Sequence, residues 1–256
     1  MPADPRAVLS RPVPPPDATL RYGDHPDQVA DLRLPPAGTP PRPLVVVVHG
    51  GFWRQEYDRA HTGPLAVDLA RHGWPVAQLE YRRTGSPGGG WPGTFADVAA
   101  GMTLLPALVA EASPQCPDPG EPLLVGHSAG GHLVLWWAAR ARARGVVALA
   151  PVTDLPGAHR LDLGGGAVAA LLGGGPAEVP HRYRYATPGA VPYPAIVVHG
   201  LLDRHVPAAM SRDWSAATGT DLIELPDVEH FGLIDPESAA WPTVVRALER
   251  LTAIRS

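Results

Sequence analysis

Short apolar runs alternate with longer stretches of helical periodicity along most of the chain. The first run, Leu44-Val45-Val46-Val47-Val48, is unbroken and β-branched, which is typical of a strand buried on both faces of a parallel sheet. Comparable runs occur at 75–80, 123–125, 146–150, 195–198 and 221–225. The segments between them predict helices at 62–72, 95–111, 129–144, 207–217 and 238–254. This alternation predicts an α/β fold with a mostly parallel central sheet and helices on both faces.

Three segments fall outside this alternation. Residues 1–17 are rich in proline and polar side chains, so we expect a mobile or surface-wrapped N-terminal leader. Residues 18–34 predict a hairpin. Residues 155–190 predict a short cap-like insertion with one helix near 167–172, and therefore a small or absent lid. We expect residues 18–256, this insertion included, to form a single domain.

The composition excludes several classes of protein. Hydrophobic residues make up 45% of the 256 positions and charged residues 18%, as in soluble globular proteins. The basic residues are scattered and the net charge is −4, so no nucleic-acid partner is expected. The N-terminus lacks the apolar segment of a secretory signal, and no apolar run approaches the ~20 residues that span a bilayer. We therefore expect a cytoplasmic protein with no membrane partner.

Neither a metal nor a cofactor is expected. Cys116 is the only cysteine, which excludes an intrachain disulfide and a cysteine-based zinc site, and its loop-like context is typical of an inert or weakly exposed thiol. Several histidines lie near the motifs described below without the spacing of a HExxH metal site. Of these, His49 and His127 are expected to hydrogen-bond the backbone. Glycine clusters that lack the features of a P-loop or a dinucleotide fingerprint are expected to be surface connections, at 88–90, 164–166 and 173–175.

The stretch GHSAGGH, residues 126–132, lies between a predicted strand and a predicted helix. Gly-x-Ser-x-Gly in this context is typical of a nucleophile elbow, a sharp turn that holds a serine hydroxyl above the carboxyl edge of the sheet. The small neighbours of Ser128 suit such a crowded turn, and the helix N-terminus that follows favours developing negative charge. Because this motif also arises by chance in glycine-rich chains, other residues must decide whether Ser128 is a nucleophile.

Candidates for a base and an orienting acid occur in the order that this architecture needs. Asp203 follows the strand predicted at 195–198, and His230 follows the last predicted strand. A single aspartate in a loop usually forms a turn or caps a helix. The joint placement of Asp203 and His230 nevertheless favours a Ser-His-Asp triad with Ser128. Asp154, which follows the preceding strand, is an alternative acid, because some hydrolases take their acid from that position.

A candidate oxyanion loop, HGGFW at residues 49–53, directly follows the first buried strand. Glycines at this place let the backbone N–H of Gly51 or Phe52 point at a substrate oxygen. The backbone N–H of Ala129, directly after the candidate nucleophile, would be the second donor. The sequence therefore predicts an oxyanion hole at Gly51, Phe52 and Ala129.

Together these motifs resemble those of the α/β-hydrolase superfamily, and in particular the branch of kynurenine formamidases and related small carboxylesterases. The similar segments are HGGFW at 49–53, GHSAGGH at 126–132, GLLDRHVP at 200–207 and EHFGLID at 229–235. The resemblance implies an α/β-hydrolase fold with Ser128 as nucleophile, Asp203 as acid and His230 as base. It also implies that the oxyanion region contains Phe52, an aromatic residue that the formamidase branch tolerates in place of the third glycine of HGGG.

The resemblance implies a serine hydrolase that cleaves small carboxylic esters or amides through an acyl-enzyme, with aryl formamides as the leading substrates. A general short-acyl carboxylesterase and an acyltransferase with the same intermediate stay open as alternatives. A catalytically silent binding protein of this fold also stays open, although its usual mark is a lost triad member and all three candidates are present. Trp53, Trp91 and Tyr185 are expected to contact substrate. The sequence leaves open whether the chain forms a homodimer.

Overall fold

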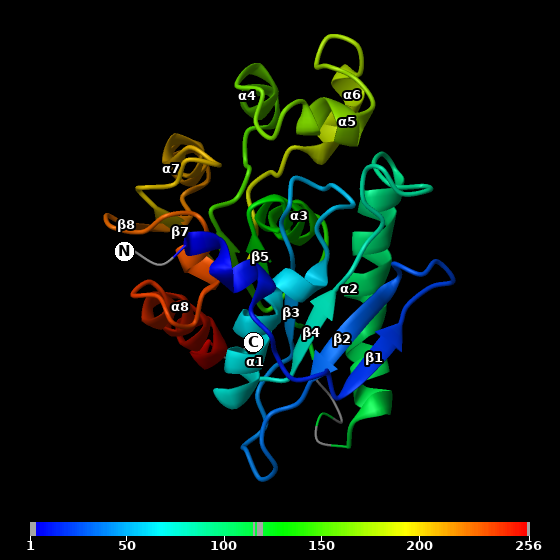
Figure 1. Cartoon of the computed structure of the whole chain (residues 1–256), viewed down its shortest axis with the longest axis vertical. Helices are drawn as coiled ribbons and strands as arrows, with labels where there is room; N and C mark the ends of the chain where they lie inside the picture. The colour runs from blue at the N-terminus through cyan, green and yellow to red at the C-terminus, as the bar shows by residue number, and fades with distance from the viewer. Residues whose placement is uncertain (1–3, 115, 117–119, 255–256) are drawn as a thin grey trace.

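Eight strands form one central sheet (Figure 1). The computed structural model describes residues 4–114, 116 and 120–254. The strands lie in the order β1-β2-β4-β3-β5-β6-β7-β8, with β1 and β2 antiparallel to their neighbours and the others parallel. Their bounds are β1 Ala18–Arg21, β2 Val29–Arg33, β3 Val45–Val48, β4 Val76–Leu79, β5 Leu123–His127, β6 Gly145–Leu149, β7 Ala195–Gly200 and β8 Asp221–Leu225. The predicted hairpin and the mostly parallel sheet are confirmed.

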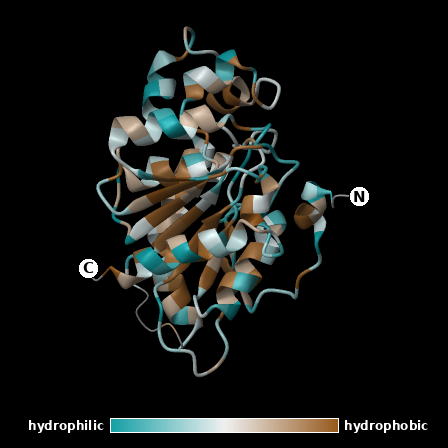
Figure 2. Cartoon of the chain, turned by 90° about the vertical axis from the view of Figure 1, so that its left-hand side faces the viewer, coloured by the Kyte–Doolittle hydropathy of each residue, from teal (hydrophilic) through white to brown (hydrophobic). Residues whose placement is uncertain are grey.

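Helices cover both faces of this sheet. Helices α1 and α8 contribute to the core on one face, and α2, α3 and α7 contribute to the core on the other. Figure 2 shows the apolar strands enclosed between the helices. The bounds of these five helices are α1 Gly63–Arg71, α2 Gly93–Ala112, α3 Ala129–Ala138, α7 Ala208–Thr218 and α8 Trp241–Ala253.

Each central strand contributes to both cores, because successive side chains of a strand point to opposite faces. In β3, Val46 and Val48 belong to the core under α2, α3 and α7, whereas Val45 and Val47 belong to the core under α1 and α8. All four side chains are buried. This burial on both faces is the physical reason for an unbroken run of β-branched residues.

Helix α2 is long and apolar enough to cross a membrane by length and composition alone. The expectation that no apolar run approaches this length is therefore wrong for this helix. Half of its most apolar window is buried inside the structure, and the core helix of a soluble protein has the same properties. Phe95, Val98, Met102 and Leu105 pack from α2 into the core, which accounts for its apolar character.

Two predicted elements differ from the structure. Helix α3 ends at Ala138 rather than at 144, because the chain must turn back to place β6 beside β5. The backbone N–H of Arg144 donates to Pro122 O across 2.9 Å at the start of that pairing. The cap-like insertion contains three short helices instead of one, which lie together at one end of the molecule (Figure 1). They are α4 Leu155–Arg160, α5 Ala167–Leu172 and α6 Pro180–Ala186.

The described part of the N-terminal leader is docked against the fold. Its short 3-10 helix η1 (Pro5–Ser10) buries Val8 completely in the core beneath α1 and α8. Arg11 then donates two hydrogen bonds to the carboxylate of Asp235, at 2.6 and 3.0 Å. Packing and a bidentate ion pair thus hold this segment in place, while residues 1–3 of the predicted leader lie outside the described residues.

We predict that Gly130→Ala destabilises the fold, although alanine is the better helix former. Gly130 lies in the first turn of α3, and a Cβ there would lie 2.0 Å from the carbonyl oxygen of Val48 at the end of β3. Accommodating the methyl group must move α3 away from the sheet, at a cost of about 1–3 kcal/mol in the free energy of unfolding. Urea denaturation measures this loss. Gly189→Ala is the matched control, because a Cβ at Gly189 meets no atom within 4 Å; equal stability of the two variants would contradict the prediction.

Candidate active site

Ser128 occupies a strained turn between β5 and α3. Its backbone angles, φ 56° and ψ −117°, lie in a region that residues other than glycine rarely adopt. The turn is held by the backbone N–H of Ser128, which donates to Leu149 O across 2.8 Å. This backbone conformation, directly after a strand and before a helix, has the geometry that the sequence analysis expects of a nucleophile elbow. Such strain persists only where the surrounding structure enforces it, as is common at functional sites.

Asp203 and His230 are brought together from the loops after β7 and β8. His230 Nδ1 lies 2.6 Å from Asp203 Oδ2, and the Asp203 side chain is fully buried. The other carboxylate oxygen accepts the backbone N–H groups of His205 at 2.7 Å and Val206 at 2.9 Å. Burial alone would raise the pKa of Asp203, but hydrogen bonds from His199 and His230 hold this pKa far below its usual range. Asp203 is therefore a carboxylate that can orient the His230 ring.

His199, at the end of β7, is a second partner of Asp203 that the sequence analysis missed. Its Nε2 lies 3.3 Å from Asp203 Oδ2 and 3.0 Å from Val206 O. Its Nδ1 lies 2.7 Å from Ser211 Oγ on α7, so both ring nitrogens have partners. A histidine within an apolar strand gave no sign of this role, because the carboxylate is brought to it by the turn that follows the strand.

Asp154, the alternative acid, has a different role in the structure. It caps the N-terminus of α4, where its Oδ1 accepts the N–H of Gly157 across 2.9 Å. Its side chain is about half exposed, and Arg160 lies 3.8 Å from its other oxygen. The acid that contacts His230 is therefore Asp203, and Asp154 serves as a helix cap.

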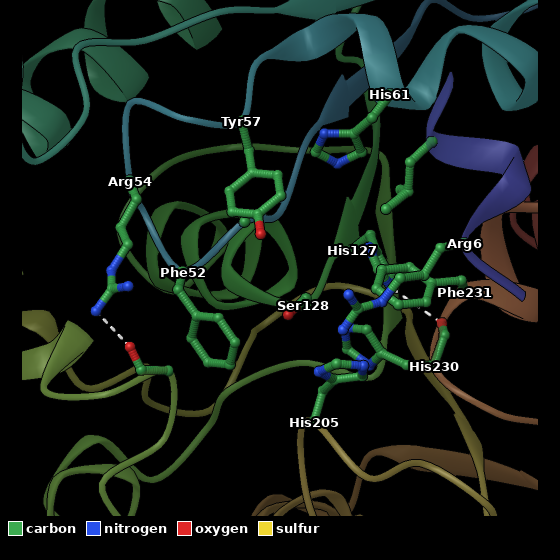
Figure 3. Close-up of a pocket in the computed structure, with 13 residues that line it drawn as sticks. Arg6, Phe52, Arg54, Tyr57, His61, His127, Ser128, His205, His230 and Phe231 are labelled. Carbon is green, nitrogen blue, oxygen red and sulfur yellow. Dashed lines mark hydrogen bonds between the residues drawn. The ribbon is translucent and has the colours of Figure 1, made fainter. Parts of the chain in front are cut away.

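Ser128 and His230 face the same cavity of about 400 Å³ (Figure 3). Next to them, His127 Nε2 lies 3.1 Å from the backbone oxygen of His230. Complete burial lowers the pKa of His127 well below its usual value, so that this ring is neutral. Within the part of the chain that the structure describes, no hydrogen bond joins Ser128 Oγ to the His230 ring. In enzymes without bound substrate such contacts are often long, and they tighten when substrate binds.

The HGGFW loop lies directly beside this turn. A Cβ built on Gly50 would lie 3.0 Å from Ser128 Cβ, which places the loop in contact with the candidate nucleophile. The loop turns sharply, with φ values of 97° at Gly51, 50° at Phe52 and 57° at Trp53. Among the described residues, the backbone N–H groups of Gly51, Phe52 and Ala129 have no hydrogen-bond acceptor. These are the groups that the sequence analysis assigned to an oxyanion hole.

A buried carboxylate, which the sequence analysis missed, contacts the first residue of the HGGFW loop. Glu80 follows β4, and its Oε1 lies 2.9 Å from His49 Nε2. The His49 ring stacks on Tyr81 with centroids 4.5 Å apart, and Tyr81 donates its hydroxyl to His49 O across 3.0 Å. Burial would raise the pKa of Glu80, but His49 and the nearby Arg83 lower it to about 2. The start of the loop is thus held by an ionised carboxylate and a stacked aromatic ring.

The three expected substrate-contacting residues do not line the cavity. Trp53 is fully buried and packs edge-on against His132, with centroids 5.3 Å apart, because the positive φ values of the loop turn its ring into the core. Trp91 and Tyr185 pack against each other with centroids 5.0 Å apart, at a separate aromatic cluster around Phe95. The expectation for Trp53, Trp91 and Tyr185 is therefore corrected.

Other residues form the cavity walls. The segment after β3 provides Gly51, Phe52, Arg54, Tyr57 and His61; the loops after β7 and β8 provide His205, His230 and Phe231; the leader provides Arg6 and Leu9; and the cap provides Gly164. Arg54 joins two of these regions, since its guanidinium donates to the backbone oxygens of Gly164 and Gly165. No composition signal marked the leader as part of the site. Among the described residues, no group of histidine, cysteine, aspartate or glutamate could hold a metal ion.

Comparisons with known proteins agree with this architecture. The BD-FAE family model matches residues 30–217. Kynurenine formamidase of Danio rerio is 31% identical over 112 residues, which are 44% of this chain and 35% of the relative. Isoprenylcysteine alpha-carbonyl methylesterase ICME of Arabidopsis thaliana is 33% identical over 115 residues, which are 45% of this chain and 26% of the relative. The chain thus spans about a third or less of the length of these curated relatives.

Solved structures of esterases share the whole fold at low sequence identity. A truncated form of a carbohydrate esterase from gut microbiota has a TM-score of 0.76 and 18% identity, with 91% of this chain and 95% of that chain covered. Esterase B from Lactobacillus rhamnosis has a TM-score of 0.71 and 22% identity, with 93% and 85% covered. These likenesses confirm the α/β-hydrolase fold. With a family model that matches most of its length, the chain belongs to the BD-FAE family.

Proposed function

We propose that the protein is a serine hydrolase that cleaves small carboxylic esters through an acyl-enzyme. One observation carries this proposal: His230, paired with the buried Asp203, and the strained Ser128 line one cavity, beside backbone N–H groups of the HGGFW loop that have no acceptor among the described residues. The esterase and formamidase names of relatives in the preceding comparisons are consistent with it. The proposed partner is a small-molecule substrate, and every step uses groups of this chain.

In the proposed mechanism, Asp203 accepts the Nδ1–H of His230 and so leaves Nε2 as the base. His230 takes the proton of Ser128 Oγ as this oxygen attacks the ester carbonyl carbon. The N–H groups of Phe52 or Gly51 and of Ala129 stabilise the negative oxygen that forms. His230 then protonates the leaving alcohol as the acyl-enzyme forms. Water, deprotonated by His230, finally releases the carboxylic acid and regenerates Ser128.

Aryl formamides are a second candidate class of substrate. Phe52, Tyr57 and Phe231 provide aromatic walls that suit an aryl group. The match to kynurenine formamidase of Danio rerio points the same way, although it covers only part of either chain. An amide would follow the same steps, with the amine in place of the alcohol.

Steady-state kcat/KM on N-formylkynurenine, 4-nitrophenyl acetate and 4-nitrophenyl butyrate separates the two classes. We expect turnover of the esters, with acetate and butyrate both accepted. A clear preference for the formamide would instead assign an arylformamidase with a cavity that restricts the acyl group. Failure to cleave any of the three, in a folded protein, would favour a catalytically silent binding protein.

We predict that Ser128→Ala lowers kcat by about 10⁴-fold or more, because it removes the attacking oxygen. A fluorophosphonate should label the parent protein at Ser128 alone, as located by mass spectrometry. Circular dichroism and thermal unfolding control for folding of the variant. Label on another serine, or retained turnover in Ser128→Ala, would reassign the nucleophile.

A matched pair of variants tests the acid. Asp203→Asn should lower kcat by about 10³–10⁴-fold, because the amide favours the wrong tautomer of His230. Asp154→Asn should leave kcat nearly unchanged, because asparagine is also a good helix cap. The same ester assay measures both. The opposite pattern would make Asp154 the acid and contradict the role proposed for Asp203.

A further inference from the structure

Arg6 places a positive charge at the rim of the proposed active site. It lies on η1, whose first turn is capped by Asp4, with the Asp4 Oδ1 accepting the N–H of Arg6 across 2.9 Å. The Arg6 side chain is exposed, lines the cavity and extends over the Phe231 ring, with Cζ 5.9 Å from the ring centroid (Figure 3). Nothing in the proposed hydrolysis uses this charge.

The charges around the cavity mouth are unbalanced. Arg6 and Arg54 both line it, and no aspartate or glutamate does so among the described residues. The guanidinium of Arg54 is occupied by two backbone oxygens of the cap. In the described part of the chain Arg6 has no acidic side chain within ion-pair distance. Since the whole chain carries a net charge of −4, this positive rim is local to the cavity.

Arg6 lies on the side of the cavity where a leaving group must be. In the proposed mechanism His230 protonates the leaving oxygen, so this oxygen lies next to the His230 ring. The Phe231 ring beneath Arg6 is edge-on to His230, with centroids 5.1 Å apart. After burial and His230, the charge of Arg6 also contributes to the lowered pKa of His205, which lines the same wall. The acyl group would lie on the other side, toward the oxyanion loop.

Apolar packing and ion pairs hold this segment against the fold. Val8 is completely buried, and Arg11 is paired with both Asp235 oxygens four residues after Phe231. The Arg11 guanidinium also lies 3.3 Å from Glu237. These contacts fix η1 on the same wall that carries His230, so that the backbone of Arg6 is held within reach of the proposed leaving-group side.

We propose that Arg6 selects substrates whose alcohol part carries a carboxylate. This inference rests on the proposed hydrolase function and names the class of substrate for that same site. A guanidinium at the rim attracts a carboxylate on the leaving group and pairs with it in two parallel hydrogen bonds. The neutral remainder of the substrate is bound by the aromatic walls.

The test compares two acetate esters that differ in one group. 4-Acetoxyphenylacetate carries a carboxylate on its leaving group, and 4-acetoxyphenylacetamide carries a neutral amide of nearly the same shape. We expect the parent protein to prefer the carboxylate in kcat/KM. Arg6→Gln should lower this preference roughly three- to tenfold, a modest effect because the guanidinium is exposed, through a loss in kcat/KM for the carboxylate that exceeds any change for the amide. The preference should also weaken in 0.5 M salt.

Three further variants test whether the preference for the carboxylate depends on the place, the shape and the anchoring of the Arg6 charge. Arg21→Gln removes the same charge from β1 at the far edge of the sheet and should leave the preference unchanged. Arg6→Lys should keep part of it, because the charge remains without the planar fork. Arg11→Gln should weaken it with Arg6 present, because η1 loses its ion pair. An unchanged preference in Arg6→Gln, or an equal loss in Arg21→Gln, would overturn the proposal.

A second pair of esters, in which the carboxylate is on the acyl group, tests whether Arg6 acts on the leaving group or on the acyl group. Mono-4-nitrophenyl adipate and 4-nitrophenyl hexanoate differ by a carboxylate at the end of the acyl chain. Arg6→Gln should leave the ratio of kcat/KM for these two esters unchanged. A change in this ratio alone would contradict the proposal that Arg6 acts on the leaving group, because it would place the carboxylate on the acyl side.

A binding measurement separates this inference from the hydrolase proposal. Calorimetry of 4-hydroxyphenylacetate with Ser128→Ala protein should give binding that Arg6→Gln weakens three- to tenfold. If no ester is cleaved but this binding depends on Arg6, the proposed hydrolysis fails and the carboxylate site stands. If esters are cleaved and binding does not depend on Arg6, the carboxylate site fails alone.

Discussion

The buried carboxylate of Asp203 is the charge on which the arrangement of the site depends. A carboxylate removed from water is strongly unfavourable unless nearby donors replace its hydration. Here the donors are the rings of His199 and His230 and the backbone N–H groups of His205 and Val206. They belong to β7 and to the loops after β7 and β8. Satisfying one charge therefore fixes these segments relative to one another and turns His230 toward the cavity.

Glu80 has a corresponding role on the other side of Ser128. It is also buried and ionised, and it contacts His49 at the start of the oxyanion loop. The loop that follows adopts positive φ at three successive residues, a conformation that costs free energy and needs support. Two ionised carboxylates, each enclosed by its own donors, thus hold the two loops between which the Ser128 turn lies. The strain at Ser128 is tolerated because both neighbours are fixed.

The sequence was sufficient to predict the sheet and to choose Ser128, Asp203 and His230 as the candidate catalytic side chains. Strands buried on both faces need continuous apolar runs, and the carboxyl ends of parallel strands meet at one edge, so the order of the motifs predicted that these three residues lie near one another. In the structure Ser128 and His230 line one cavity, and Asp203 contacts His230. The sequence was not sufficient for Trp53, because the direction of that ring depends on backbone angles that no local pattern specifies. Glu80 was missed for a related reason: its partner His49 follows a different strand and meets it only in the folded sheet.

The leader and the cap complete the cavity without belonging to the sheet that carries the chemistry. Arg6 reaches the rim from one side and Gly164 from the other, each held by a few polar contacts to loops of the site. Their sequences are rich in proline or glycine and lack periodicity, so their positions come from tertiary contacts alone. Because the carboxylates that order the proposed triad are buried and the rim is exposed, rim residues can change without disturbing those buried contacts. If the two proposals hold, selection of substrate and cleavage of the bond are separable properties of this fold: the first would be controlled at the exposed edge of the cavity and the second beneath it.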